Sequence, residues 1–211
     1  MEIVLDVYQR PYDSKRPVIC LDEKPGQLLK EVNEPLPLKA GQPRRYDYEY
    51  RRAGTYNVFV AVEPLAGWRY LEVRPTRTSV DFAQVLAALA DRYREAETLT
   101  IVLDNLNTHR FSSLWKAFGP ERALQLARRI QFVFTPVHGS WLNMAEIELA
   151  AMQTECLGRR RLGNLETVSR ETQLWAKQRN RRGVTIDWGF TVDDSRTKFH
   201  RHYANEFDQS A

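Results

Sequence analysis

The sequence predicts an α/β fold in which helices cover both faces of one sheet. The expected elements follow the order three strands, helix, strand, helix, strand, helix, which is typical of this class. Residues 98–103 form an almost continuously apolar run, as in a strand buried on both faces in the middle of a mixed or parallel sheet. The chain has 211 residues, of which 43% are hydrophobic, so it is long enough for one domain with a substantial core.

The first strands come from the N-terminal third of the chain. Residues 1–16 are predicted to form a short helix and a turn-rich lead-in, and residues 17–22 a buried strand. Residues 24–55 contain several prolines and glycines and are predicted to be irregular. Residues 56–62 and 68–73 follow as the two strands of a hairpin, joined by a loop of about five residues.

The rest of the chain is predicted to alternate between helices and strands. Ser79 or Asp81 is expected to cap the first helix, and Asn164 to cap the last one, which Gly183 ends. The elements expected after the first helix are a strand at 98–103, a helix at 120–129, a strand at 130–135, and helices at 141–157 and 164–181. The predicted organisation is a lead-in (1–16), one α/β domain (17–183) and a C-terminal tail (184–211).

Composition narrows the class of protein. No run approaches 18 consecutive apolar residues, so no membrane-spanning helix is predicted. The N-terminus lacks the basic and apolar regions of a signal peptide. The two cysteines, Cys20 and Cys156, do not suggest a disulfide framework, and Cys20 is predicted to be a small buried side chain. These features favour a reducing, cytoplasmic location.

Three carboxylates stand where strands end or a helix begins. Asp22 ends the apolar run at 18–21, Asp104 ends the run at 101–103, and Glu146 lies at the start of a predicted helix. Hard divalent cations such as Mg²⁺ prefer oxygen ligands. Three converging carboxylates could hold two such ions, and a pair of ions can stabilise both oxygens of an in-line displacement at a phosphodiester. This pattern favours a nuclease or strand transferase.

Each carboxylate also has a structural interpretation. Asp22 and Asp104 could accept backbone N–H groups at strand ends, and Asn143 and Glu146 have the spacing of a capping box. Glu148 competes with Glu146, because residues two apart on a helix point about 200° away from each other and only one can face a shared site. Glu146 borders the predicted packed face of the helix and is preferred.

The sequence gives less support to a zinc site, a serine hydrolase or a nucleotide-binding phosphate loop. Neither His109 nor His138 lies at zinc-ligand spacing with a cysteine. The G-x-S-x-G motif of hydrolases and the glycine-rich phosphate loop G-x-x-x-x-G-K-[ST] are both absent from the sequence.

Basic residues are concentrated in two segments. Residues 157–182 are strongly basic, and residues 44–52 interleave arginines with tyrosines, a combination that can hold a phosphate backbone and stack on bases. A solvated helix face and a strand with tyrosines packed on one side are the alternative interpretations. The residues predicted to contact DNA are Arg44, Arg45, Arg159, Arg160, Arg161, Lys177, Arg181 and Arg182.

The segments at 21–27, 103–109 and 135–146 resemble the three catalytic blocks of DDE transposases. The sequence is most similar to the bacterial insertion-sequence group related to the mariner-like elements, and the resemblance covers about residues 17 to 200. It implies a ribonuclease-H-like fold with a mixed five-stranded sheet flanked by helices, so that 17–183 would be the catalytic domain.

The resemblance also implies an activity and its residues. The activity is metal-dependent cleavage of a DNA strand followed by strand transfer from a free 3′-hydroxyl, with two Mg²⁺ or Mn²⁺ ions. Asp22 would bridge both ions, while Asp104 would bind one and Glu146 the other. The side chains expected to orient these ligands are Asn105, His109, His138 and Asn143.

The implied partners are the transposon ends and the target DNA, with a homodimer in the active complex and a bacterial, nucleoid-associated location. Relatives carry helix-turn-helix modules before the catalytic domain, whereas about 16 residues precede the first strand here, so recognition of terminal repeats is not expected of this chain. Two alternatives stay open: a non-catalytic nucleic-acid-binding or oligomerisation remnant of a transposase, and a ribonuclease-H-like nuclease that acts on RNA–DNA hybrids.

Overall fold

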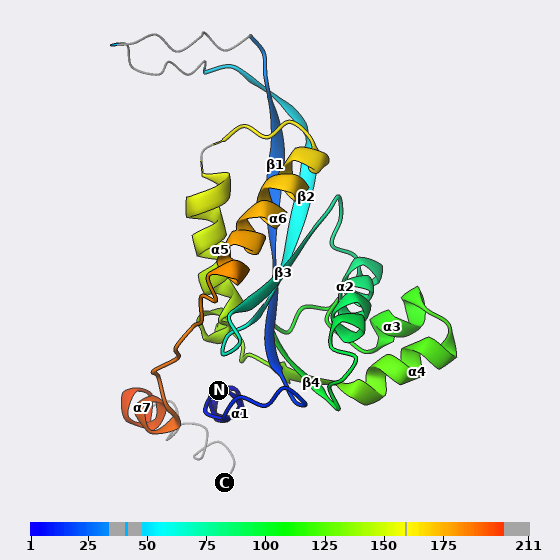
Figure 1. The fold of residues 1–211 in the computed structure, drawn as a ribbon, viewed down its shortest axis with the longest axis vertical. Helices are drawn as coiled ribbons and strands as arrows, with labels where there is room; N and C mark the ends of the chain where they lie inside the picture. Colours follow the sequence, from blue (N-terminus) through cyan, green and yellow to red (C-terminus); the bar gives the residue numbers. More distant parts are fainter. Residues whose placement is uncertain (34–40, 42–47, 159, 201–211) are drawn as a thin grey trace.

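The computed structural model describes residues 1–33, 41, 48–158 and 160–200. Its centre is a five-stranded mixed sheet with the strand order β3-β2-β1-β4-β5 (Figure 1). Antiparallel pairing joins β1 to β2 and β2 to β3, and parallel pairing joins β1 to β4 and β4 to β5. The strands are β1 (Val18–Glu31), β2 (Tyr50–Glu63), β3 (Trp68–Arg74), β4 (Leu99–Leu103) and β5 (Ile130–Phe134). The predicted mixed five-stranded sheet is confirmed.

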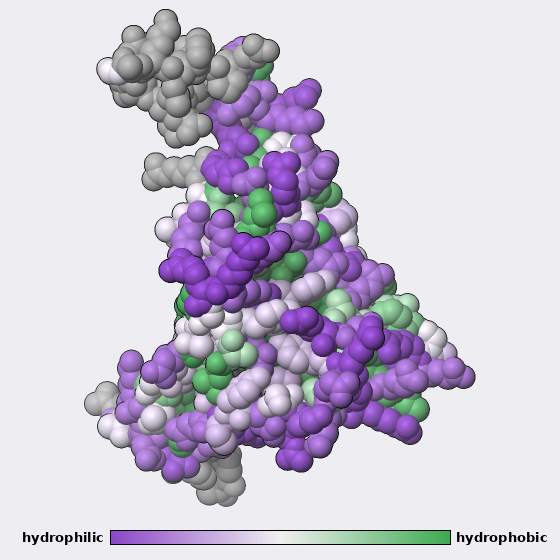
Figure 2. Space-filling view, in the orientation of Figure 1, coloured by the Kyte–Doolittle hydropathy of each residue, from purple (hydrophilic) through white to green (hydrophobic). Residues whose placement is uncertain are grey.

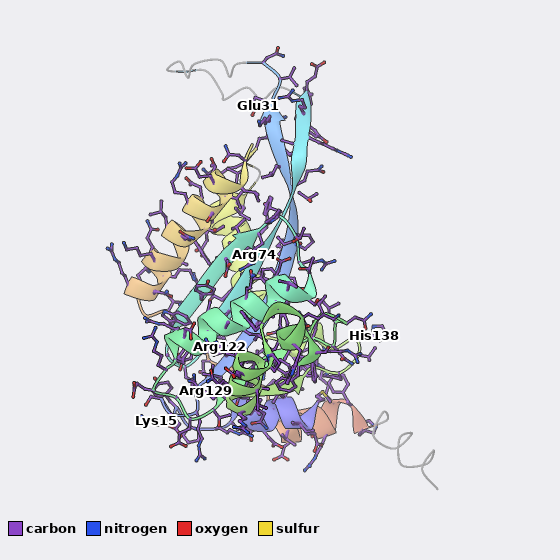
Figure 3. All side chains as sticks on the ribbon, turned by 90° about the vertical axis from the view of Figure 1, so that its right-hand side faces the viewer. Lys15, Glu31, Arg74, Arg122, Arg129 and His138 are labelled. Carbon is purple, nitrogen blue, oxygen red and sulfur yellow. The ribbon has the colours of Figure 1, made fainter. Side chains whose placement is uncertain are left out.

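Helices cover both faces of this sheet, as predicted. The helices α2 (Ser79–Arg92), α3 (Ser112–Ala117) and α4 (Pro120–Arg129) lie on the face that is turned to the viewer in Figure 3. The helices α5 (Ala145–Met152) and α6 (Leu165–Arg181) lie on the opposite face. The short helices α1 (Glu2–Tyr8) and α7 (Val192–Lys198) lie side by side near the chain ends. None of the described helices is long and apolar enough to cross a bilayer.

Successive side chains of β1 point to opposite faces of the sheet. Ile19 and Leu21 belong to the core beneath α2, whereas Cys20 is buried in a separate cluster with Val102 of β4 and Ala145 of α5. The predicted burial of Cys20 is confirmed. This alternation determines which side of the sheet each residue that follows will face.

The prediction that residues 24–55 are irregular is wrong at both ends of that segment. The strand β1 continues to Glu31 and β2 begins at Tyr50, so the two form a long arm, with Glu31 near its far end (Figure 3). β1 pairs with β4 only through Val18–Cys20, so Pro25 lies where β1 is an edge strand on one side, a setting that tolerates proline. At Gly26 a side chain would meet the ring of Tyr56, so glycine allows the aromatic ring to cross the strand.

Helix boundaries differ from the prediction in ways that local hydrogen bonds explain. Thr78, rather than Ser79 or Asp81, is the cap of α2, and Asp81 completes a capping box by accepting the Thr78 N–H at 2.8 Å. The predicted cap of α6 is confirmed, since Asn164 accepts the N–H of Thr167 at 2.8 Å.

The helix predicted at 141–157 is divided into three parts. A 3₁₀ turn η1 (Ser140–Leu142) precedes α5, and a π-helical segment η2 (Gln153–Leu157) follows it. The helices α3 and α7 were not predicted, because each spans less than two full turns and presents little apolar periodicity. The division into 1–16, 17–183 and 184–211 stays a prediction.

Candidate active site

Asp22 and Asp104 occupy equivalent positions on neighbouring strands. Cys20 of β1 is the register partner of Val102 of β4 in a parallel pair, and each aspartate comes two residues later. Because side chains two residues apart share a face, both aspartates point toward the side that α5 covers. The sheet thus brings two acids together that are 82 positions apart in the printed sequence.

Asn143 links the third acid to this pair. Its buried side chain donates to the Leu21 carbonyl oxygen at 2.9 Å and lies 3.5 Å from Asp22 Oδ2. The other side of the amide, Oδ1, accepts the N–H of Ala145 at 3.1 Å, which is the first residue of α5. Glu146 follows directly, in the first turn of the helix. One amide therefore connects β1, Asp22 and the helix that carries Glu146.

The capping box expected at this helix start is wrong. Met144 is the cap of α5 and provides no side-chain hydrogen bond, while Asn143 uses its oxygen on Ala145. The Glu146 carboxylate is exposed and has no hydrogen-bond or ion-pair partner among the described residues. The structural role that competed with a ligand role for Glu146 is therefore missing.

The other two acids influence Asp22 electrostatically. Burial is the largest effect on Asp22 and raises the pKa of its carboxyl, against a hydrogen bond from the Glu23 N–H that lowers it. The negative charges of Glu146, Glu23 and Asp104 raise it further, to about 7. The carboxyl of Asp22 therefore stands in a field of excess negative charge, which a cation would relieve.

His109 connects Asp104 to a carboxylate on the other face of β1. Its Nδ1 lies 2.7 Å from Asp104 Oδ1, and its Nε2 lies 3.2 Å from Glu23 Oε2. Burial of the imidazole is the largest single effect and lowers its pKa, but Asp104 and Glu23 together overcome it and raise the pKa to about 9. The ring also packs against Phe82 of α2 at a centroid distance of 4.5 Å. The charged imidazole thus fixes the position of Asp104.

Glu23 is the polar residue of this site that the sequence analysis missed. It is buried, directly follows Asp22, and points toward His109 and, at 3.9 Å, Arg77. Two features of the sequence could have pointed to Glu23. It lies inside the block at 21–27, and it follows Asp22 on a strand, so its side chain faces the opposite side of the sheet.

Two of the side chains predicted to orient ligands are not brought to the acids. Asn105 and His138 are exposed, and neither makes a hydrogen bond to Asp22, Asp104 or Glu146 among the described residues. His138 lies at the side of the molecule, away from the arm (Figure 3), with a backbone φ of 61°.

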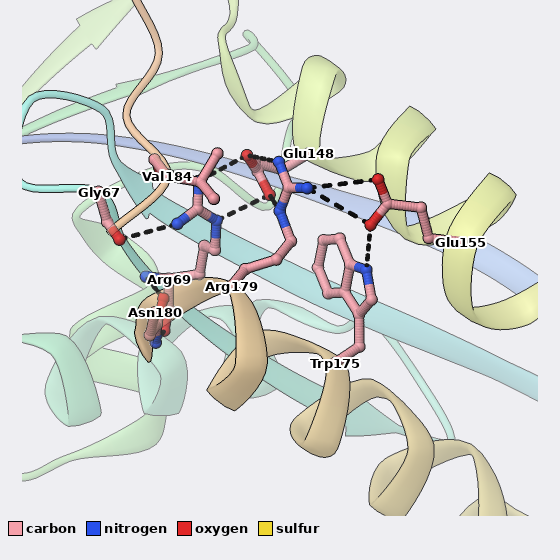
Figure 4. Close-up of polar contacts among 8 residues, drawn as sticks. All are labelled: Gly67, Arg69, Glu148, Glu155, Trp175, Arg179, Asn180 and Val184. Atoms are coloured by element: carbon pink, nitrogen blue, oxygen red, sulfur yellow. Dashed lines mark hydrogen bonds and ion pairs between the residues drawn. The ribbon is translucent and has the colours of Figure 1, made fainter. Parts of the chain in front are cut away.

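Glu148 was the alternative to Glu146 as a ligand, and both of its carboxylate oxygens accept hydrogen bonds in a buried network (Figure 4). Arg69 of β3 donates to both of its oxygens at 2.8 Å, and Arg179 of α6 does so at 3.1 Å. Burial raises the pKa of Glu148 and is the largest single effect, but the two guanidinium groups outweigh it, so the pKa is lowered. The network attaches α5 to β3 and α6, and Glu148 is unavailable as a metal ligand.

The residue types of the acid group fit a hard divalent cation. Asp22, Asp104 and Glu146 offer only oxygen donors, and burial together with the neighbouring carboxylates raises the pKa of Asp22. As the side chains stand, no group of three or more His, Cys, Asp or Glu within the described ranges is arranged so that it could hold a metal ion. Binding would require the side chains of the group to turn toward a shared ion.

The predicted DNA-contacting residues fall into three sets. Arg44, Arg45 and Arg159 lie outside the described residues. Arg160 pairs with Glu171 at 2.9 Å, and Arg161 pairs with Glu31 of β1. Lys177, Arg181 and Arg182 are exposed, at the C-terminal half of α6 and just beyond it. The last set presents its charges to solvent.

Comparisons with known proteins agree with this architecture. The protein family described as DDE superfamily endonuclease matches residues 17–169. A Mos1 transposase paired-end complex with a left transposon end is 18% identical, with a TM-score of 0.57, and the match covers 87% of this chain and 55% of that one. A Mos1 mariner paired-end complex with Mn is 17% identical, with a TM-score of 0.56 and the same coverage.

A pre-cleavage Mos1 transpososome is 18% identical, with a TM-score of 0.56, 87% of this chain covered and 56% of that one. The chain therefore spans about half the length of the solved transposases that it matches, and at this identity the likeness concerns the fold. No curated protein sequence matches at a significant level. The family match extends over the strand that carries Asp22, the strand that Asp104 directly follows and the helix that carries Glu146, and the chain belongs to the DDE superfamily endonucleases.

Proposed function

We propose that this chain is the catalytic domain of a DDE transposase and that Asp22, Asp104 and Glu146 are its metal-binding, catalytic residues. The observation that carries the proposal is their arrangement. Asp22 lies on β1, Asp104 directly follows the adjacent parallel strand β4, and Glu146 lies in the helix turn held by Asn143. The charges of Asp104 and Glu146 both act on Asp22. The family match over residues 17–169 supports the same assignment.

The proposed cofactor is a pair of Mg²⁺ or Mn²⁺ ions. When bound, such ions stabilise the charge on the attacking and leaving oxygens of a phosphodiester and favour deprotonation of the nucleophile. The all-oxygen donor set supports this choice. Solved Mos1 paired-end complexes named with Mn and with Mg support it as well.

The protein's own residues would position these ligands. The charges of both other acids act on Asp22, and in our proposal Asp22 would help to hold both ions. Asn143 restrains Asp22 from one side. His109, itself held by Glu23, restrains Asp104. Precise orientation of ligands by surrounding hydrogen bonds commonly changes metal affinity by about 10- to 100-fold.

The proposed substrate is DNA, cut in one strand and then joined through the 3′-hydroxyl to target DNA. The Mos1 structures that share the fold are named as complexes with a transposon end and as a strand transfer complex, which supports this choice. A homodimer in the active complex, a bacterial insertion-sequence origin and a nucleoid-associated cytoplasmic location remain predictions.

The test is metal-dependent nicking of duplex DNA by single variants. Asp104→Asn and Glu146→Gln are expected to abolish nicking in Mn²⁺ while the thermal unfolding temperature stays within a few degrees of wild type. Asp187→Asn and Glu166→Gln are matched controls, because both residues are exposed and form no hydrogen bond or ion pair with the acids among the described residues.

Full activity in either site variant would remove that residue from the proposal. An RNA–DNA hybrid assayed beside duplex DNA separates a transposase from a ribonuclease-H-like nuclease, since only the latter prefers the hybrid. A wild-type chain that neither cuts DNA nor binds Mn²⁺ would be the non-catalytic remnant.

A further inference from the structure

A shallow groove of about 540 Å³ lies between the edge strand β3 and the helix α6, away from the acid group. Its walls are formed by Trp68 and Tyr70 of β3, Arg92 at the end of α2, and Gln173, Lys177 and Arg181 of α6. Figure 2 shows strongly hydrophilic side chains gathered over α6, next to a paler band. The groove therefore combines aromatic surface with basic and amide groups.

The groove carries net positive charge. None of the residues that line it is acidic. Lys177 and Arg181 are exposed and form no ion pair with a carboxylate among the described residues. They are four residues apart, so they share a face of α6 and lie about 6 Å apart along its axis. Phosphates of one DNA strand follow one another at about 3.4 Å of helix axis, so two cations about 6 Å apart span about two phosphate steps.

Arg92 is held in place beside them. Its guanidinium lies over the Trp68 ring, 5.1 Å from the ring centroid, which positions the cation. Arg92 forms no ion pair among the described residues, although its charge also acts on the Glu63 carboxylate. An arginine fixed in this way loses less conformational freedom when it contacts a phosphate.

The wall formed by β3 is partly closed to pairing with another strand. Asn180 of α6 accepts the Arg69 N–H and donates to the Arg69 carbonyl oxygen, both at 2.9 Å, as a paired strand residue would. An open edge strand invites strand addition, but here the amide side chain already satisfies the backbone at Arg69. This favours a ligand that is recognised by side chains rather than by backbone pairing.

The groove is placed to receive DNA that extends beyond the proposed reaction centre. Asp22 is opposite Val60 of β2, and Val60 is opposite Leu71 of β3, which also lines the groove. Two strand spacings, about 10 Å in all, separate the backbone at Asp22 from that at Leu71.

We propose that this groove binds the sugar-phosphate backbone of a DNA segment outside the one that is cut, with Arg92, Lys177 and Arg181 as the contacting cations. The inference rests on the proposed function for the identity of its partner. It assigns to the β3–α6 edge a role in holding DNA that is separate from the carboxylates.

The test is the salt dependence of DNA binding, measured without metal in the Asp104→Asn background. A labelled duplex is titrated at salt concentrations between about 50 and 200 mM, where each phosphate contact contributes about 0.9 to the slope of log K against log [salt]. Lys177→Gln/Arg181→Gln is expected to lower the magnitude of this slope by about 1.8, and Arg92→Gln by about 0.9.

The matched control is Lys116→Gln/Arg128→Gln, which removes the same charge from exposed positions on α3 and α4. Its slope is expected to equal that of the Asp104→Asn parent. A groove variant with an unchanged slope, a control that loses as much, or a chain that binds no duplex would each overturn the inference.

The two proposals fail independently. Loss of nicking in the acid variants together with an unchanged slope in the groove variant would leave the catalytic assignment and remove the groove. Persistent nicking in the acid variants together with a reduced slope in the groove variant would remove the catalytic assignment and leave the groove.

Discussion

Arg69 and Glu148 form a two-pronged ion pair in the interior, with Nε–Oε2 and Nη2–Oε1 distances of 2.8 Å and both side chains fully buried. This pair joins the edge strand β3 to α5, because Glu148 lies on α5 two residues after Glu146. Removing one member of a buried pair leaves a charge without compensation, which typically costs about 3–5 kcal/mol of stability. The pair therefore fixes the helix that presents the third acid.

We expect Glu148→Met to lower the free energy of unfolding by about 3–5 kcal/mol in urea titrations, because the fully buried Arg69 then has no carboxylate partner among the described residues. The exposed pair of Arg122 and Asp91 offers the comparison. Arg122→Met should cost no more than about 1 kcal/mol. Equal losses for the two variants would contradict the view that the buried pair holds α5 in place.

His109→Ala is expected to weaken Mn²⁺ binding by about 10- to 100-fold, because Asp104 loses the imidazole that orients it. Isothermal titration calorimetry measures the affinity directly. His138→Ala is the matched control, since His138 is exposed and makes no contact with the acids among the described residues, and it should leave the affinity unchanged. Similar affinities for both variants would remove His109 from the group of positioning residues.

The capping box of α2 should make stability depend on pH in acid. Burial raises the pKa of Asp81, but hydrogen bonds from Thr76, Thr78 and Arg74 outweigh it and lower the pKa from 3.8 to about 2. A lowered folded-state pKa stabilises the fold above the unfolded value, and this stability is lost as the pH falls from about 4 to about 2. Urea titrations at pH 5 and in that window should show the loss in wild type, and Asp81→Asn should reduce it. An Asp81→Asn variant with the same pH dependence as wild type would refute this linkage.

Gly26→Ala should destabilise the arm, because an added Cβ would lie 2.2 Å from the Tyr56 ring and force the ring to move. Overpacking of this kind costs about 1–3 kcal/mol. Gly189→Ala is the comparison, since Gly189 is exposed, its φ is not positive, and nothing lies within 4 Å of the new atom. The double change Gly26→Ala/Tyr56→Ala should lose less than the sum of the two single changes. Additive losses would show that the ring is not what the glycine accommodates.

The sequence predicted the sheet well, because strands depend on local patterns, and it singled out the three acids, whose catalytic role stays a prediction. Apolar runs that end in Asp22 and Asp104 are visible without tertiary information, and so is the family resemblance that the match over residues 17–169 confirms. The arm was missed because Pro25 and Gly26 are usually breakers, and only the pairing of β1 with β2 shows why they are tolerated here.

Long-range polar contacts were beyond sequence reasoning. Glu23 meets His109 across 86 positions, and Arg69 meets Glu148 across 79. The residues around an acidic side chain in the sequence do not show whether a basic partner lies nearby on another strand or helix. For the same reason, Glu148 could be set aside as a ligand only once its two arginines were located.

Asp22 stands at a fork in the sheet. Before it, β1 is hydrogen-bonded to β2 on one side and to β4 on the other; beyond it, only β2 continues alongside. Neighbouring strands that part in this way open a crevice at their ends, and α/β sheets commonly bind their ligands at such a point. The same divergence places Asp22 at the base of the arm. A force or displacement applied to the arm would therefore be transmitted to the strand segment that carries this carboxylate.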